Sequence, residues 1–224
     1  MIRLSWMGQF GNQLFQYCFA KILAKQYGMA LKIDKPYWVN NSGGKLKPQL
    51  FPVKQEKGRV EGIIRLRGFF QVYQYYKPHK SVIKEWFTLP QLPEVPKDVL
   101  CVHVRRKTNN IRTTFKEFQM CIGRAKEWNK IWVITDTPDR FTYKFKKYYK
   151  ARIVSNNFAK DFLTLASARQ VVMSYQSTFS WWATWLGNCE NIFVSVPSEK
   201  ALRNQRLIVD DEPRFHYVRF KNFL

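Results

Sequence analysis

Two arginines, Arg105 and Arg106, directly follow an apolar run that ends near His103. A guanidinium is always charged and can hold two phosphate or carboxylate oxygens in a planar geometry that a lysine ammonium cannot copy. The alternative for either arginine is an ordinary surface ion pair. Because both stand where a buried strand is expected to leave its sheet, the pattern favours binding of an anionic group.

A second candidate site is a run of hydroxyl and aromatic side chains: Ser177, Thr178, Phe179 and Ser180. The hydroxyls can cap a helix that begins near Phe179. Its first-turn amides and the positive end of its dipole suit a phosphate. The alternative is a plain capped helix whose following tryptophans pack into the core.

Asp161 opens another helical pattern, where a carboxylate is favourable near a helix start. The functional alternative is that it accepts from N1–H and N2–H of a guanine, the edge that distinguishes guanine from adenine. The sequence has no Walker lysine loop, no GxSxG or HExxH motif, and no Asp-x-Asp pair that would hold a metal–nucleotide complex. It therefore predicts no metal site.

The elements that must position these residues follow from the apolar pattern. Residues 2–5 and 29–34 are expected to be strands on either side of a helix over 12–27 that Gly28 ends. Prolines at 90, 93 and 96 punctuate segment 89–96, which cannot continue a helix or strand. We expect this segment to link an N-terminal half, 1–88, to a C-terminal half, 97–224.

The C-terminal half alternates apolar runs with helical patterns. Strands are expected at 99–104, 131–135, 171–174 and 192–196, each buried on both faces. This alternation predicts an α/β fold with a parallel sheet, whose ligands lie beyond the carboxyl ends of the strands. His103, Arg105 and the run that begins at Ser177 all fall at such ends.

The composition is strongly basic, with 38 Lys and Arg against 16 Asp and Glu and a net charge of +22. Nucleic acid, an anionic membrane and phosphorylated ligands are the partner classes that such a charge suits. The densest run, 144–152, is expected to be a solvated helix face and loop, with an anionic surface as the alternative partner.

The four cysteines form no CxxC pair and are expected to be reduced core residues. The N-terminus lacks a signal-peptide apolar region, and no apolar run reaches the ~20 residues of a membrane span. We expect a cytoplasmic location, with peripheral association with a membrane face as the alternative.

Four segments, in order, resemble the α-1,2-fucosyltransferase family. They are Met7 to Tyr17 (MGQFGNQLFQY), Gly68 to Tyr76 (GFFQVYQYY), His103 to Arg106 (HVRR), and Asp161 to Leu186, which contains Ser-Thr-Phe-Ser-Trp-Trp. The resemblance implies a compact GT-B-like fold of two Rossmann-like halves. It also implies inverting transfer of L-fucose from GDP-fucose to a sugar hydroxyl, O-2 of galactose in a glycan acceptor, with no metal or other cofactor.

The resemblance also implies roles for individual residues. Arg105 would neutralise the leaving diphosphate with support from Arg106, while His103 and Asp161 would hold the guanosine. Ser177, Thr178, Phe179 and Ser180 would hold the phosphates. In the N-terminal half, Asn12 would orient the reacting groups, with Gln13 and Gln71 in acceptor-binding or positioning roles.

One departure from the family pattern is that Lys107-Thr108 follows the two arginines, where the family usually has Gly-Asp. Asp136 and Asp139 are the candidates to replace the missing carboxylate, and the general base stays unassigned. Two other functions remain open. One is polyanion or nucleic-acid binding on a degenerate transferase scaffold, and the other is transfer from a different nucleotide sugar. Retention of the diphosphate-facing residues favours the fucosyltransferase.

Overall fold

The computed structural model describes residues 1–33, 51, 56–105, 113–196 and 206–219. The chain divides into two compact units, Met1–Pro90 and Gln91–Leu224. The division falls inside the proline-rich segment 89–96, which has no helix or strand. Each unit is built around its own parallel sheet, which confirms the predicted α/β class.

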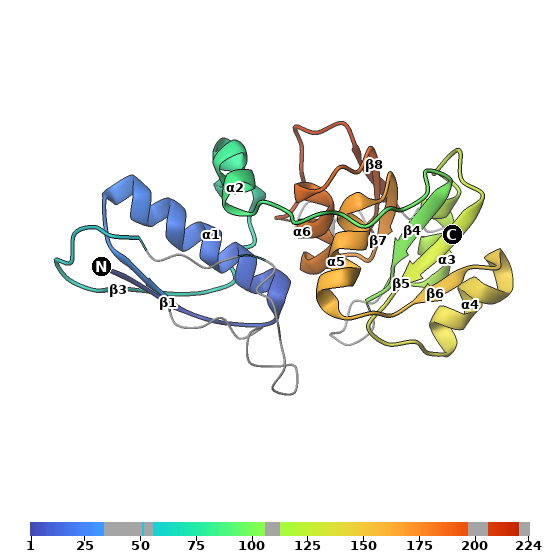
Figure 1. Ribbon diagram of the computed structural model, residues 1–224, viewed down its shortest axis with the longest axis horizontal. Helices are drawn as coiled ribbons and strands as arrows, with labels where there is room; N and C mark the ends of the chain where they lie inside the picture. The colour runs from blue at the N-terminus through green and yellow to red at the C-terminus, as the bar shows by residue number, and fades with distance from the viewer. Residues whose placement is uncertain (34–50, 52–55, 106–112, 197–205, 220–224) are drawn as a thin grey trace. The chain divides into compact units, whose positions relative to one another are not determined.

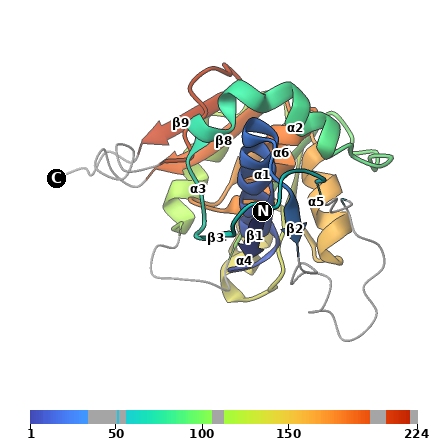
Figure 2. The same cartoon turned by 90° about the vertical axis from the view of Figure 1, so that its left-hand side faces the viewer.

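The first unit has a sheet in the order β2-β1-β3, with all described pairs parallel. Its strands are β1 (Ile2–Ser5), β2 (Leu31–Ile33) and β3 (Ile64–Arg67). Figure 2 shows β1 between its two neighbours, with α1 (Phe10–Tyr27) running along the sheet. Two 3-10 turns, Tyr73–Tyr75 and Lys77–His79, lead into α2 (Lys80–Trp86).

Helix α1 begins at Phe10, two residues earlier than predicted, and the preceding Gln9 is extended. It ends at Gly28, as predicted. Gly28 adopts the left-handed conformation, with φ of +61°. The N–H groups of Gly28 and Met29 then donate to the carbonyls of Lys25 and Ala24 at 3.3 and 2.9 Å. This paired arrangement is the Schellman ending that glycine favours at a helix C-terminus.

The second unit has a parallel sheet in the order β6-β5-β4-β7-β8-β9. Counted from β4, this is the order 3-2-1-4-5-6 of Rossmann-type nucleotide-binding sheets. The strands are β4 (Val99–His103), β5 (Lys130–Ile134), β6 (Arg152–Val154), β7 (Gln170–Met173), β8 (Asn191–Val196) and β9 (Phe215–Arg219).

Helices cover both faces of this sheet (Figure 1). They are α3 (Phe115–Ile122), α4 (Arg140–Tyr149), α5 (Phe158–Ser167) and α6 (Thr178–Leu186). Phe118 of α3 and Phe145 of α4 pack with Leu100 and Val102 of β4 in one apolar cluster. Helices α5 and α6 cover the other face, and Trp182 and Trp185 are fully buried there. Burial from both sides explains why β4 is apolar throughout.

The four cysteines are free and buried, as predicted. Their burial explains why they occur singly within apolar segments, where each behaves as a small hydrophobic side chain. Within the described ranges, no helix is long and apolar enough to cross a membrane.

Candidate functional site

The candidate site of the second unit lies at the carboxyl edge of its sheet. The chain starts this sheet at β4, runs outward through β5 and β6, and returns on the other side of β4 as β7. The connections that leave β4 and β7 therefore diverge to opposite faces of the sheet. Such a reversal point is where open α/β sheets bind their ligands.

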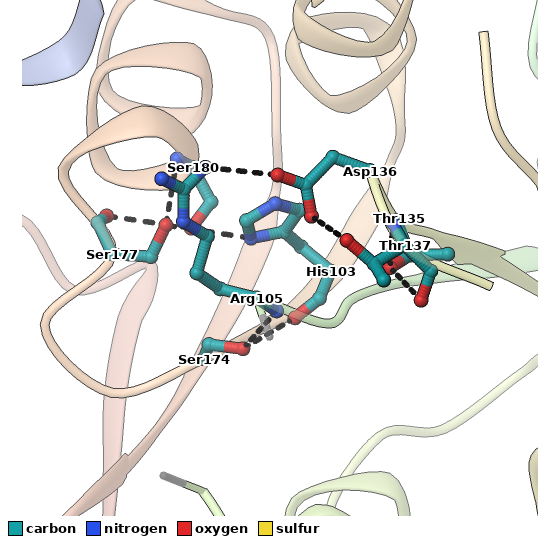
Figure 3. A network of polar contacts seen from close by, with 8 residues as sticks. All are labelled: His103, Arg105, Thr135, Asp136, Thr137, Ser174, Ser177 and Ser180. Atoms are coloured by element: carbon teal, nitrogen blue, oxygen red, sulfur yellow. Dashed lines mark hydrogen bonds and ion pairs between the residues drawn. The ribbon is translucent and has the colours of Figure 1, made fainter. Parts of the chain in front are cut away.

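Arg105 lies at this point, two residues beyond the end of β4. Its backbone N–H donates to Ser174 Oγ at 2.9 Å, and its Nη1 donates to Asp136 Oδ2 at 3.4 Å. Figure 3 shows the guanidinium extending from the end of β4 toward Asp136, which follows β5. The Arg105 side chain is 23% exposed, and the Asp136 side chain is 36% exposed. The guanidinium is thus held at the edge and still reaches solvent.

Ser174 joins the ends of β4 and β7, a role that was not predicted. Its Oγ donates to the His103 carbonyl at 2.9 Å while accepting from the Arg105 amide. Its own backbone N–H donates to the same carbonyl at 3.2 Å. Ser174 therefore fixes the backbone from which Arg105 projects. A serine at the end of an apolar strand signals a hydrogen-bonding role, but its partners come from a distant segment and could not be identified from the local sequence.

Ser177 caps α6, as predicted. Its Oγ accepts from the Ser180 amide at 3.4 Å and lies 3.5 Å from His103 Nδ1 (Figure 3). Helix α6 begins at Thr178, one residue before the predicted position, and its first-turn amides have no carbonyl partner within the helix. Ser180 is fully buried, and its hydroxyl donates to the Ser177 carbonyl at 3.4 Å. Its hydroxyl thus supports the helix start.

His103 is buried beneath this helix start. Its ring centroid lies 5.5 Å from that of Phe179, and the two rings are tilted by 32°. Burial, together with the positive charge of Arg105, lowers the pKa of His103 to about 3. The ring is therefore neutral near pH 7. It can form a hydrogen bond with the Ser177 hydroxyl without adding a charge to the site.

Asp161 lies in the first turn of α5, which begins three residues before it at Phe158. The helix starts early because the Asn157 side chain caps it, accepting from the Lys160 amide at 2.9 Å. Asp161 Oδ1 accepts from the backbone N–H and the side-chain Nδ2 of Asn156 at 3.2 and 3.1 Å. Burial raises the pKa of Asp161 to about 6, although the Asn156 hydrogen bonds oppose the shift.

The two carboxylates proposed to replace the family's Gly-Asp have different surroundings. Asp136 pairs with Arg105, and its negative charge also helps to raise the pKa of Asp161. Asp139 instead forms the capping box of α4 with Thr142: Oδ1 accepts from the Thr142 amide at 2.9 Å. The structure thus brings Asp136 to the edge site and uses Asp139 as a helix cap. Arg106 and Lys107-Thr108 lie outside the described residues.

The predicted residues of the first unit form a separate group. Gln71 Nε2 donates to Asn12 Oδ1 at 2.9 Å, which joins the segment after β3 to the first turn of α1. Gln13 is fully buried, and its Nε2 donates to the Gly8 carbonyl at 3.1 Å. Gly8 has a φ of +67°, and a Cβ there would lie 2.1 Å from Asn12 Nδ2. Glycine at position 8 thus permits this turn and leaves room for the Asn12 amide beside it.

Among the described residues, no group of three His, Cys, Asp or Glu side chains is placed to hold a metal ion. The positive groups described at the edge site are the Arg105 guanidinium and the start of α6. These two groups suit an anion, and the neutral His103 beside them adds no charge of its own. The buried carboxyl of Asp161 adds a hydrogen-bond acceptor in the same unit.

No protein-family model matches the chain, and no curated protein sequence matches it. A similar solved structure is described as NodZ alpha-1,6-fucosyltransferase soaked with GDP-fucose. The two chains share 13% identity with a TM-score of 0.44, over 85% of this chain and 93% of the other. This likeness is too low to assign a reaction to the chain.

Proposed function

We propose that the protein transfers L-fucose from GDP-fucose to a sugar hydroxyl, with inversion and without a metal. The observation that carries the proposal is the placement of Arg105 and the capped start of α6 at the reversal point of a Rossmann-type sheet. The ordered resemblance of four sequence segments to α-1,2-fucosyltransferases supports the donor. It also supports the finer assignment, O-2 of a galactose-containing glycan.

The donor would bind to the second unit through three sets of groups. The diphosphate would lie against the Arg105 guanidinium and the amides that begin α6. The ionised carboxylate of Asp161 would accept from the N1–H and N2–H of guanine. His103 would act from beneath, by packing with Phe179 and by orienting the Ser177 hydroxyl.

The reaction breaks the bond between fucose C1 and the β-phosphate oxygen, while the acceptor oxygen bonds to C1 from the opposite face. The acceptor hydroxyl releases its proton to an unassigned general base or to water, and GDP leaves with one additional negative charge. Arg105 would stabilise that charge as it grows, which accelerates the step because the guanidinium is held in place beforehand. The positive groups come from the protein itself, which supports a metal-independent mechanism.

Asn12, Gln13 and Gln71 would serve the acceptor side. Gln13 holds the Gly8 turn, and Gln71 fixes the side-chain oxygen of Asn12. With Oδ1 engaged in this way, the amide has one preferred orientation, so it can present a hydrogen bond to a sugar hydroxyl with little loss of conformational freedom.

Thermal unfolding against a panel of nucleotide sugars tests the donor. GDP-fucose at about 100 times its Kd should stabilise the folded state by about 2.7 kcal/mol, whereas UDP- and ADP-sugars should leave Tm unchanged. Added EDTA should not alter the shift. Transfer to a galactoside, followed by NMR of the product, then tests the 1,2 linkage. Stabilisation by a different nucleotide sugar alone, or loss of the shift with EDTA, would contradict the proposal.

A further inference from the structure

The solvent-facing side of α4 carries an ordered row of positive charges. Arg140, Lys144 and Lys147 are all exposed, and their i, i+4, i+7 spacing places them along one side of the helix. The opposite side buries Thr142 and Phe145. The helix is anchored by its inner side, and the cationic row lies outermost.

Two tyrosines flank this row. Tyr143 is 52% exposed and Tyr148 is 63% exposed, which makes them prominent exposed aromatic side chains of the second unit. The Tyr148 ring also touches the partly buried ring of Phe115, with the centroids 5.2 Å apart. A tyrosine with an exposed ring and a polar tip suits the headgroup level of a lipid bilayer.

Helix α4 itself supplies no acidic side chain to balance this charge. The sequence of α4, RFTYKFKKYY, contains no Asp or Glu, and the exposed Lys150 and Arg152 follow it. In the part of the chain that the structure describes, no acid forms an ion pair with Arg140, Lys144 or Lys147. Like charges four residues apart repel one another within a helix, and an anionic partner would remove that repulsion.

We propose that this face of α4, defined by Arg140, Tyr143, Lys144, Lys147 and Tyr148, docks the protein onto an anionic lipid surface. A helix with a basic outer face and interfacial aromatic residues is the kind of element that binds at the level of lipid headgroups. Single-stranded nucleic acid, by contrast, is bound along grooves that track its backbone. The cationic row here lies on the outer side of a single helix.

The docking face belongs to the same unit as the candidate donor site and shares a connection with one residue of that site. Asp136, which pairs with Arg105, and Arg140, which opens the cationic row, are both in the segment that follows β5. Docking would therefore hold the donor site close to the membrane, which suits an acceptor carried on a lipid or displayed at its surface. The inference goes beyond the proposed reaction, and its test needs no donor or acceptor.

The test is co-sedimentation of the full chain with vesicles of phosphatidylcholine alone or of phosphatidylcholine with phosphatidylserine. The wild type should bind only the anionic vesicles, and binding should fade as salt is raised. The variant Arg140→Gln/Lys144→Gln/Lys147→Gln should partition about 100-fold more weakly, because each well-placed cation contributes about a factor of five. Tyr143→Ser should weaken binding as well, with no change of charge.

A matched control removes the same charge elsewhere. Lys97, Arg124 and Lys126 are exposed residues of the same unit, located near the amino ends of β4 and β5. Their replacement by glutamine should leave binding within a few-fold of the wild type, and circular dichroism should show that both triple variants are folded. Equal losses in the two triple variants would indicate only a net-charge effect and would overturn the proposal. So would a loss of oligonucleotide binding in the α4 variant with unchanged vesicle binding.

Discussion

Lowering the pH should weaken donor binding through Asp161, and the pKa of about 6 sets where this happens. A neutral carboxyl carries a proton on one oxygen, so it cannot accept from both guanine N–H groups. With a pKa near 6, about nine-tenths of the free protein has an ionised Asp161 at pH 7 and about one-tenth at pH 5. The Kd for GDP-fucose should therefore rise about tenfold between these two pH values.

The assay is calorimetric titration with GDP-fucose, because its diphosphate is substituted at both ends. The terminal phosphate of free GDP would itself titrate with a pKa near 6 and obscure the result. His103 does not contribute, since its pKa of about 3 keeps it neutral throughout this range. Asp161→Asn should bind weakly with no dependence on pH between 5 and 7.

A second variant moves the midpoint in a known direction. The Asn156 side chain stabilises the ionised form of Asp161, so Asn156→Ala should move the binding midpoint above pH 6. Constant wild-type binding from pH 5 to 7, or a tenfold change that persisted in Asp161→Asn, would refute the role of Asp161 in guanine binding.

Protonation of Asp161 does not unfold the protein, so unfolding through this group cannot explain weaker donor binding at low pH. Its folded pKa lies above the ordinary value of 3.8, so the folded state holds the proton more tightly than the unfolded state. Its contribution to stability is fully present below pH 3.8 and is lost as the pH rises through about 6. Acid should thus weaken donor binding while this group favours folding, and a parallel unfolding curve at each pH separates the two effects.

Three further predictions concern the remaining candidate residues. Arg105→Lys keeps the charge but loses the planar bidentate geometry, so turnover should fall about 100-fold or more in a folded protein. Near-normal activity would show that Arg105 is not part of the site, and a variant that does not fold would indicate a structural ion pair. Asn12→Ala should lower kcat far more than affinity for GDP, because the nucleotide contacts are proposed in the other unit, and equal losses in both would refute its acceptor-side role. Ser174→Ala leaves the Arg105 amide without its acceptor, so it should lower the free energy of unfolding by about 1–3 kcal/mol. It should also lower kcat without altering the pH midpoint of donor binding. Unchanged stability and kcat would show that the hydrogen bonds of Ser174 are not needed to position Arg105.

The strands that were predicted from the sequence have a clear apolar pattern, which is continuous in β4 and alternates in β1. The run at 99–104 corresponds to β4, and its apolar side chains reflect helices on both faces. Three strands had not been predicted: β3, β6 and β9. Strand β3 is largely exposed and alternates isoleucine and leucine with arginine, β6 has three residues, and β9 mixes buried and exposed positions. Their pairing depends on neighbours distant in sequence, which a local pattern cannot supply.

The role of a site residue was predictable where the groups that it contacts lie in the same segment of the sequence. Ser177 caps the helix that directly follows it, so its role could be inferred from local sequence. The role of Ser174 could not, because its partners, His103 at the end of β4 and Arg105 just beyond it, are 71 and 69 residues away. Asp136 and Asp139 look equivalent in sequence. Only the fold shows that one faces Arg105 while the other caps α4.

The pairing of Arg105 with Asp136 is compatible with an anion-binding role because the pair is weak. At 3.4 Å and with both side chains partly exposed, such a pair contributes about 0–1 kcal/mol. A diphosphate offers more negative charge and bidentate acceptors, so it can displace this contact or share the guanidinium with it. Meanwhile the contact keeps the guanidinium extended over the edge, and Ser174 fixes the backbone below it. Because His103 stays neutral beside them, it adds no positive charge to that of Arg105, the group proposed to meet the departing diphosphate.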